Sequence, residues 1–425
     1  MSAPFAWLVS PAGQQALAEA EALEPQEADF LRCYTGLARR YPPEQARLAL
    51  ETAILRRAAR VKFPAAGRMY FTRPALEQAS SQAVAGYRAL RYAGLAAGQD
   101  GAPGLQAVLD LGCSIGGDTL ALAQHLPVTG VDLDPLRLQM ARQNMLAAGP
   151  AAGHPAGFIQ ADLSARLPLR LSPEVGLFFD PARRDEQRRI YSVRQYHPPL
   201  AVIDGWLEQA PALGVKLSPG VDLDELSGYA AEIEFISLHG ELKEAVLWFG
   251  PLRSAARRRA TLLPGPHTLA GPGDDAQPPK TGGPHQTGGP PLGGEPPTSP
   301  PLAWLYEPDP AVLRAGLVRQ LAAELGASQL DPDIAYLTGE HPVDTPFARR
   351  WAVDAWMPFQ LKRLRAALRE RRAGRLTVKK RGSPIEPQEL LQSLRLKPAE
   401  HPEQRVLFLT HLRGEPVVVI CYPAQ

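Results

Sequence analysis

The middle of the chain alternates between two hydrophobic patterns. Five short apolar runs are typical of strands buried on both faces of a sheet. They lie at 108–113, 128–132, 158–161, 175–180 and 215–217. The segments between them predict helices, so the pattern indicates an α/β fold with a mostly parallel sheet. Two further strands, near 233–238 and 244–249, are so close in sequence that they must be antiparallel, because a parallel crossover needs a dozen residues or more.

Helical spacing dominates the N-terminal part, up to about residue 97. Apolar positions recur at this spacing from 29 to 37 and again from 46 to 55. Thr72 followed by Pro74 is a typical start of a further helix, because the hydroxyl can cap and proline is tolerated in the first turn. We therefore expect a helical N-terminal extension over residues 1–97.

The C-terminal segment, 302–425, mixes helical and strand patterns. Asp309 caps a predicted helix that ends before Gly326, and a second helix runs from Pro358 to Gly374. A strand, a helix and a hairpin follow, at 376–378, 389–394, and 405–412 with 416–422. The pattern predicts a small α+β module.

Proline and glycine dominate the stretch between these parts, 264–301, and no useful apolar period is present. Such a composition cannot bury enough surface to offset the entropy of ordering, so we expect a disordered linker. The expected domains are the extension at 1–97, an α/β domain at 105–262, the linker at 263–301 and the module at 302–425.

Composition narrows the class of protein. Hydrophobic residues make up 45% and charged residues 21%, as in globular proteins, and 46 basic side chains nearly balance 44 acidic ones. The three cysteines are far apart and show no metal-ligand spacing, which predicts no metal site and suits a reducing cytosol. No signal peptide or membrane span is expected, and the interpretation is a cytoplasmic protein.

Candidate chemistry begins at the exit of the first predicted strand. Asp110, Gly112 and Gly116 form a D-x-G-x-x-x-G loop between a strand and a helix, and glycine lets the backbone approach a ligand closely. No Gly-Lys-Ser/Thr follows, so a phosphate-gripping P-loop is disfavoured. The next strand ends at Asp132, where a carboxylate can accept hydrogen bonds from ribose hydroxyls, and Asp134 competes for that role.

These motifs, in this order, resemble those of the class I S-adenosylmethionine (SAM) dependent methyltransferases. The loop from Asp110 to Gly112 is similar to the motif that lies against the methionine end of SAM. Asp132 resembles the ribose-binding acid, and Asp162, in the stretch 158–162, resembles the acid that accepts from adenine. The stretch 177–181, with Asp180, is similar to the motif that faces the methyl acceptor.

The resemblance implies a Rossmann-like sheet of five parallel strands closed by an antiparallel hairpin, with SAM as cofactor. Cys113 and Leu133 complete the expected cofactor contacts within the first two motifs. Asp110 has an alternative role as a structural acid beneath the loop. A NAD-binding doubly wound domain, or one without a ligand, is the alternative for the whole fold. Phe71-Thr72 resembles an aromatic–hydroxyl pair near SAM in trimethylguanosine synthase-like enzymes, although a helix cap also explains Thr72.

The acceptor motif departs from that of enzymes that methylate base amines. Those enzymes commonly have Asn/Asp/Ser-Pro-Pro-aromatic, whereas Asp180-Pro181 is followed by alanine and Arg183. Asp180 is the candidate catalytic residue, to orient or deprotonate the acceptor, and capping of the strand end is the alternative. Arg183 and Arg184 are candidates for gripping phosphates, or form a solvated loop. Lys216, in the stretch 216–220 at the end of the fifth strand, opens on the same sheet edge and can add a cation.

Positive charge gathers in the C-terminal module. Residues 349–413 hold 16 Lys/Arg and 6 Asp/Glu, a balance of 16 − 6 = +10. Lys379, Lys380 and Arg381 are a candidate phosphate footprint, with solvated helix faces as the alternative. The stretches 376–382 and 407–410 resemble THUMP-like C-terminal domains found behind bacterial methyltransferase domains. True THUMP domains bind the acceptor end of tRNA and usually precede the catalytic domain, so the order here is reversed.

The sequence thus predicts a SAM-dependent methyltransferase whose basic C-terminal module docks RNA, either tRNA or rRNA. One alternative is a methyltransferase that acts on a protein or a small molecule. The other is a SAM- or RNA-binding protein without catalysis. The oligomeric state does not follow from the sequence.

Overall fold

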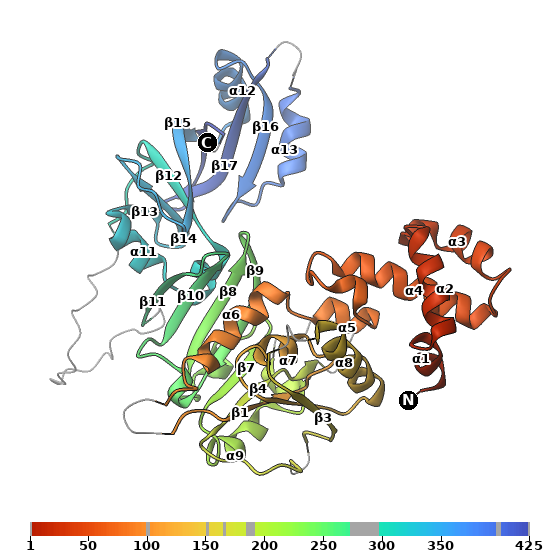
Figure 1. Cartoon of the computed structure of the whole chain (residues 1–425). Coiled ribbons are helices and arrows are strands. Elements are labelled where there is room, and N and C mark those ends of the chain that lie inside the picture. Colours follow the sequence, from red (N-terminus) through yellow and green to blue (C-terminus); the bar gives the residue numbers. More distant parts are fainter. Residues whose placement is uncertain are drawn as a thin grey trace. The chain divides into compact units, whose positions relative to one another are not determined.

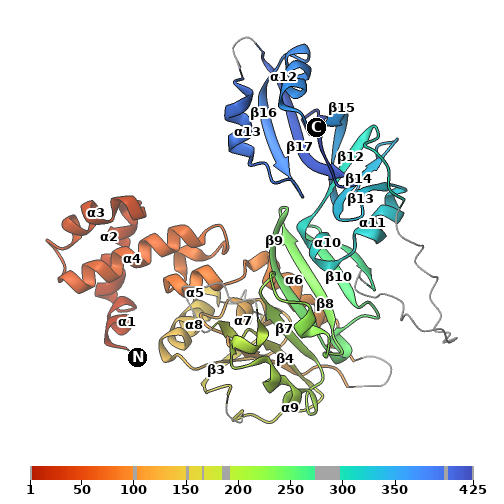
Figure 2. The same cartoon turned by 180° about the vertical axis from the view of Figure 1, so that it is seen from behind.

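The computed structural model describes residues 2–98, 103–149, 153–164, 167–183, 192–272, 297–396 and 401–423. The chain divides into two compact units (Figures 1 and 2). Unit 1 consists of Met1–Glu234 and Lys243–Ala255, and unit 2 consists of Phe235–Leu242 and Ala256–Gln425.

Helices form the N-terminal part of unit 1, as the sequence predicts. They are α1 (Ala3–Leu8), α2 (Pro11–Ala22), α3 (Phe30–Leu37), α4 (Pro43–Ala59), α5 (Arg73–Gln78) and α6 (Gln82–Ala93). The hydroxyls of Ser10, Thr72 and Ser81 cap α2, α5 and α6 by accepting from a backbone N–H of the first turn. The core of α1–α5 also contains Ile115 and Met140 from the α/β part, so the extension packs directly on it.

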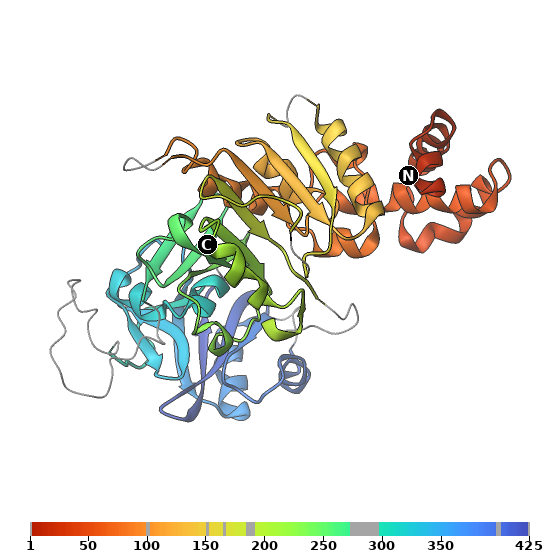
Figure 3. The same ribbon diagram turned by 90° about the horizontal axis from the view of Figure 1, so that it is seen from below.

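A parallel sheet forms the centre of unit 1. Its strands, in spatial order, are β3 (Ala156–Gln160), β2 (Val128–Asp132), β1 (Ala107–Leu111), β4 (Val175–Phe179) and β7 (Leu213–Leu217). Every neighbouring pair in this group is parallel. Helices α7 (Gly117–Leu122) and α8 (Pro135–Ala148) lie with α6 on one face, and α9 (Ile203–Leu207) lies on the other (Figures 1 and 3). The predicted five-stranded parallel sheet is confirmed.

The sheet continues past β7 with antiparallel strands. Strand β9 (Glu241–Trp248) pairs antiparallel with β7, and its hairpin partner β8 (Glu232–Leu238) lies beyond it. This is the closing hairpin that the short spacing predicts. Strands β10 (Arg258–Leu263) and β11 (His267–Gly271) then complete the order β11-β10-β8-β9-β7-β4-β1-β2-β3.

Strand β11 contradicts the start of the expected disordered linker at 263–301. The residues between β10 and β11 include Pro264 and Gly265, which here make the turn of an antiparallel hairpin with Leu262 opposite His267. Leu269 is buried in this hairpin. The proline- and glycine-rich composition therefore begins with a turn, and the second segment of unit 2 begins at 256 rather than at 302. The rest of the predicted linker, 273–296, lies outside the described residues.

The C-terminal part of unit 2 is an α+β module, as predicted, with more strands than expected. Its sheet has the order β13-β14-β12-β15-β18-β17-β16. The strands are β12 (Trp304–Pro308), β13 (Ser328–Asp331), β14 (Ile334–Gly339), β15 (Ala348–Pro358), β16 (Ala373–Lys380), β17 (Glu403–Leu412) and β18 (Glu415–Cys421). The helices are α10 (Pro310–Ala315), α11 (Val318–Leu325), α12 (Leu361–Glu370) and α13 (Pro387–Leu394).

Two differences from the sequence prediction stand out in this module. The single helix expected from Asp309 to Gly326 is broken into α10 and α11, because Gly316 adopts a left-handed conformation that ends α10. Strands β12, β13, β14 and β15 were not expected. Strand β15 has an irregular register and carries charged residues along its length, so its sequence lacks a clear strand pattern.

The two faces of the C-terminal sheet differ. Helices α12 and α13 cover one face through Leu364, Leu368 and Leu390. The other face is lined by aromatic and aliphatic side chains, among them Trp351 and Phe408. On this side, Asp331 at the end of β13 accepts from the N–H of Gly414 in the β17–β18 turn. Among the described residues, no helix is long and apolar enough to cross a membrane.

Candidate active site

The glycine loop between β1 and α7 lies at the carboxyl edge of the parallel sheet. Gly112 and Gly116 have φ of 87° and 81°, a region that favours glycine, and Ser114 between them has φ of 48°. A Cβ added to Gly112 would lie 2.5 Å from the carbonyl oxygen of Asp180. The loop backbone therefore presses directly on the exit of β4, which brings the first and fourth motifs together.

Asp132 holds this loop from the end of β2. Its carboxylate accepts from the N–H of Ser114 at 2.8 Å and from the N–H of Asp134 at 2.9 Å. Asp134 itself caps α8, because its Oδ1 accepts from the N–H groups of Leu136 and Arg137. The side chain of Asp134 thus caps α8, whereas the side chain of Asp132 binds the glycine loop.

Leu133 and Asp162 continue the same edge onto β3. The side chain of Leu133 is 56% exposed although it is large and apolar. Asp162 is exposed, and its Oδ1 accepts from the N–H of Ser164, a bond that lowers the pKa of the Asp162 carboxyl. The two side chains lie at the ends of neighbouring parallel strands.

Asp110 and Cys113 lie beneath the loop. Asp110 is fully buried and its Oδ2 accepts from the hydroxyl of Thr119 at 2.5 Å, which ties β1 to α7. Burial raises the pKa of the Asp110 carboxyl, and the charge of Asp118 adds to the shift. Cys113 is buried with its thiol against Gly130. This arrangement agrees with the alternative role of Asp110 as a structural acid, and direct contact of these two residues with a cofactor stays a prediction.

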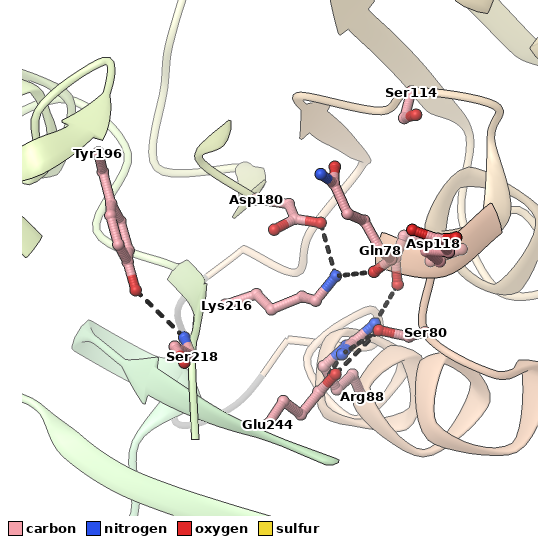
Figure 4. Close-up of polar contacts among 12 residues, drawn as sticks. Gln78, Ser80, Arg88, Ser114, Asp118, Asp180, Tyr196, Lys216, Ser218 and Glu244 are labelled. Carbon is pink, nitrogen blue, oxygen red and sulfur yellow. Dashed lines mark hydrogen bonds and ion pairs between the residues drawn. The ribbon is translucent and has the colours of Figure 1, made fainter. Parts of the chain in front are cut away.

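Asp180 and Lys216 form an ion pair at the exits of β4 and β7 (Figure 4). Nζ of Lys216 lies 2.7 Å from Oδ2 of Asp180 and also donates to the carbonyl of Gln78 at 3.3 Å. Burial raises the pKa of Asp180, and the Lys216 charge offsets only part of that rise. Burial lowers the pKa of Lys216, but the charges of Asp180, Asp118 and Glu244 together outweigh it and the net shift is upward. Lys216 thus lies at the same sheet edge as Asp180, as predicted, and its role toward a substrate stays a prediction.

A buried charge network beside this pair was not predicted. Arg88, which is 2% exposed, forms ion pairs with Asp118 in the first turn of α7 and with Glu244 on β9. Ser80 donates to Glu244 at 2.8 Å, and Arg88 lies over the ring of Phe178, 4.8 Å from its centroid. Burial lowers the pKa of Arg88, but the two carboxylates outweigh it and the net shift is upward. Arg88 and Glu244 are too far apart in sequence for any motif to connect them.

A second link between the extension and the loop passes through Asn144 of α8. Its side-chain amide donates to the carbonyls of Tyr70 and Ile115 and accepts from the N–H of Tyr70 at 2.7 Å. The segment that contains Phe71 and Thr72 is therefore fixed next to the loop. Thr72 caps α5, which agrees with the simpler of its two predicted roles.

Two of the predicted phosphate-gripping residues follow β4. Arg183 belongs to β5 (Ala182–Arg183), which pairs with β6 (Tyr196–His197) in a small separate sheet, and only its backbone is described. Arg184 lies outside the described residues. Their roles stay predictions.

In unit 2, Lys379 does not form part of an open basic surface. Its Nζ pairs with Glu307 of β12 and lies over the rings of Trp351 and Phe408, 5.2 and 6.0 Å from their centroids. Strand alternation puts Lys379 on the face of the sheet that carries Trp351 and Phe408, and it pairs with Phe408 in the register of β16 and β17. The charge of Lys379 therefore interacts mainly with groups of the module itself.

Lys380 and Arg381 lie elsewhere. Lys380, on the opposite face of β16, pairs with Glu386, and Arg381 lies over the ring of Tyr336, 4.9 Å from its centroid. The three consecutive cations therefore do not share one surface, which corrects the predicted footprint at 379–381.

Comparison with known proteins identifies the family. Models of a methyltransferase domain, a THUMP domain-like family and a domain family of unknown function match residues 108–175, 348–423 and 2–59. An uncharacterised SAM-dependent methyltransferase of Mycobacterium tuberculosis, from strains CDC 1551 and H37Rv, is 35% identical over 360 residues, which cover 82% of this chain and 88% of that protein. The chain belongs to the SAM-dependent methyltransferases.

The fold of this methyltransferase has also been seen in a crystal structure. A candidate methyltransferase from Porphyromonas gingivalis W83 aligns with a TM-score of 0.73 and 20% identity, over 97% of this chain and 99% of that one. The similarity extends through the helical extension and the C-terminal module. The predicted class I methyltransferase fold with a THUMP-like domain is confirmed, and the NAD-binding alternative is set aside.

The residues at the carboxyl edge fit SAM. A carboxylate offers about four acceptor positions, and Asp132 uses two of them for backbone N–H groups, so positions remain for ribose hydroxyls. Leu133 offers an exposed apolar surface next to it, suited to the adenine ring. Among the described residues, no group of three or more His, Cys, Asp or Glu side chains could hold a metal ion.

Proposed function

We propose that this methyltransferase methylates RNA, which it holds through a basic surface of unit 2. The observation that carries the proposal is a set of exposed cations on one helix and the turn after it. They are Lys362, Arg363 and Arg369 of α12 and Arg372 in the turn after it. Within the part of the chain that the structure describes, none of them forms an ion pair with a carboxylate.

The arrangement of α12 explains why these charges share a surface. Leu364, Ala367 and Leu368 pack against the sheet, so the cations at 362, 363 and 369 lie on the outer side of the helix. Phosphates bind such surfaces by releasing counterions, largely independent of sequence. The match of 348–423 to the THUMP domain-like family adds support, since THUMP domains bind RNA. We therefore propose that the phosphate-binding surface lies at 362–372 rather than at 379–381.

At the catalytic edge, bound SAM supplies an electrophilic methyl group on a sulfonium. We assign the ribose to Asp132, an apolar contact with adenine to Leu133, and the methyl acceptor to Asp180. Asp180 lies against the glycine loop and its carboxylate is 30% exposed, so an acceptor can reach it beside the cofactor. Asp180 then orients the acceptor or takes its proton.

Asp132→Ala is expected to weaken SAM binding by roughly ten- to a hundredfold. The loss of charge-assisted hydrogen bonds costs about 1.5–3 kcal/mol, and each 1.4 kcal/mol is tenfold in affinity. Isothermal titration calorimetry with SAM measures this. Asp134→Ala is the matched control, because Asp134 caps α8 and its loss should lower stability with little change in affinity. Equal affinities of the Asp132 variant and the wild type would remove Asp132 from the site.

The RNA surface is tested by changing Lys362, Arg363, Arg369 and Arg372 together to alanine. If each cation neutralises one phosphate, the slope of log K against log salt should become shallower by about 3. Filter binding of total tRNA and of rRNA fragments at several salt concentrations measures the slope. SAM affinity should not change, because it depends on unit 1.

A matched control removes three exposed cations of unit 1 that are already in ion pairs, Arg32, Arg47 and Arg73. This control variant should keep the wild-type slope. If the wild type itself binds RNA weakly and without salt dependence, the surface is merely solvated. A protein or small-molecule substrate would then replace RNA in the proposal.

A further inference from the structure

The ion pair of Asp180 and Lys216 offers two different hydrogen-bonding groups side by side. Oδ2 of Asp180 is taken by Lys216, which leaves Oδ1 as an acceptor. Nζ of Lys216 donates to Asp180 and to the carbonyl of Gln78, which leaves its third N–H as a donor. Figure 4 shows the two groups converging from neighbouring strand ends. An acceptor and a cationic donor are thus presented together where the methyl acceptor is expected.

Several nucleobase edges match this pattern of hydrogen bonds. They differ in the charge that develops on the base during methylation. When an exocyclic amine attacks a methyl group, positive charge develops on the base, and a nearby ammonium opposes it. When a ring N–H next to a carbonyl loses its proton, negative charge moves onto the carbonyl oxygen, and an ammonium stabilises it. The raised pKa of Lys216 keeps its charge at neutral pH.

Resting on the proposed RNA substrate, we infer that this site takes a lactam edge, a ring N–H next to a carbonyl, as in guanine and uracil. Asp180 Oδ1 accepts the ring N–H and receives its proton, while Lys216 Nζ donates to the adjacent carbonyl oxygen. The ring nitrogen forms a bond to the methyl carbon as the methyl–sulfur bond breaks, and the sulfur leaves as a neutral thioether. Charge balances, because the cationic methyl donor becomes neutral and the carboxylate becomes a carboxylic acid.

The sequence of the acceptor motif agrees with this assignment. Enzymes that methylate base amines commonly follow Asp-Pro with a second proline and an aromatic ring, and here Ala182 and Arg183 stand in those positions. Lys216 adds a cation, which would oppose methylation of an amine. Two independent observations, the ion pair and the motif, therefore favour a ring nitrogen as acceptor.

Equilibrium binding tests the inference without turnover. The probes are GMP, UMP, AMP and CMP, added to the full-length protein with S-adenosylhomocysteine present, and binding is followed by ligand-observed NMR. All four carry the same phosphate, so differences arise from the base. We expect GMP or UMP to bind about tenfold or more tightly than AMP and CMP, because a mismatched base edge typically weakens a two-point hydrogen-bond contact by at least that factor. Equal binding of all four would overturn the inference.

Nucleoside mass spectrometry of RNA treated with the protein and SAM gives the second readout. Guanosine or uridine methylated on a ring nitrogen supports the inference. Methylation of an exocyclic amine of adenosine or cytidine overturns it and leaves the RNA substrate intact. A preference for GMP or UMP without any methylated RNA supports lactam recognition and removes RNA as the substrate.

Variants of Lys216 separate its charge from its shape. Lys216→Ala should lower kcat by about 10²–10³-fold, as for the loss of one donor to a developing oxyanion, and should abolish the preference among mononucleotides. Lys216→Arg should restore part of both, because it keeps the charge. Unchanged S-adenosylhomocysteine affinity shows that each variant is folded. A Lys216→Ala variant with wild-type kcat and preference would overturn the role of Lys216.

Discussion

Asp180→Asn is expected to lower kcat by about 10²–10⁴-fold, the usual contribution of a general base, and to leave SAM affinity nearly unchanged. Asparagine keeps the size of the side chain but cannot take a proton. The fold should survive, because the backbone contacts of residue 180 do not change. Gly112 still packs against its carbonyl oxygen, and its N–H still donates to the carbonyl of Leu111. Single-turnover kinetics and calorimetry with SAM separate the two effects.

The pH dependence of the wild type gives a second check on Asp180. Burial raises the pKa of this carboxyl above its ordinary range, so the acid limb of kcat should lie at higher pH than for an exposed carboxylate. Lys216 lowers that pKa, so Lys216→Ala should move the acid limb further up in pH. Full activity of Asp180→Asn, or an acid limb that persists in it, would leave Asp180 as a strand-end residue only.

Arg88→Met is expected to lower the free energy of unfolding by about 3–5 kcal/mol. Breaking a buried ion pair leaves uncompensated charge, here on Asp118 and Glu244, which are 14% and 3% exposed. Urea denaturation, fitted to two transitions if the two units unfold separately, measures the loss.

The matched control is Arg47→Met, in the exposed ion pair of Arg47 with Glu51. It should change the free energy of unfolding by less than about 0.5 kcal/mol, because exposed pairs contribute little. If both variants lose equally little, Arg88 is not the link that holds α6, α7 and β9 together. The triple change of Arg88, Asp118 and Glu244 to apolar residues should recover part of the loss.

Local sequence was sufficient for the catalytic sheet. Asp110, Asp132 and Asp180 lie at or near the ends of three apolar runs, and parallel strands bring such ends to one edge, so their proximity could be predicted. Lys216 was predicted for the same reason. Asp134 could not be separated from Asp132, because only the hydrogen bonds of the folded chain show that it caps α8.

Contacts between residues far apart in sequence, and the sheet face on which a residue lies, could not be predicted in the same way. Arg88 and Glu244 meet only because α6 packs beside β9, and Asn144 joins Tyr70 to Ile115 across three segments. The charge run from Lys379 to Arg381 misled, because alternation along β16 divides it between two faces and one cation pairs with Glu307. The strand β11 was hidden by a proline-glycine turn that resembles the start of a linker.

The central claim is that this methyltransferase modifies RNA, and its most direct test is to follow the methyl group. The full-length protein is incubated with SAM carrying a deuterated methyl group and an extract from cells that lack the protein. RNA, protein and small molecules are then separated and analysed by mass spectrometry. The account predicts the label in nucleosides of the RNA fraction, and its loss with Asp180→Asn. Label in protein or small molecules alone, with none in RNA, would contradict it.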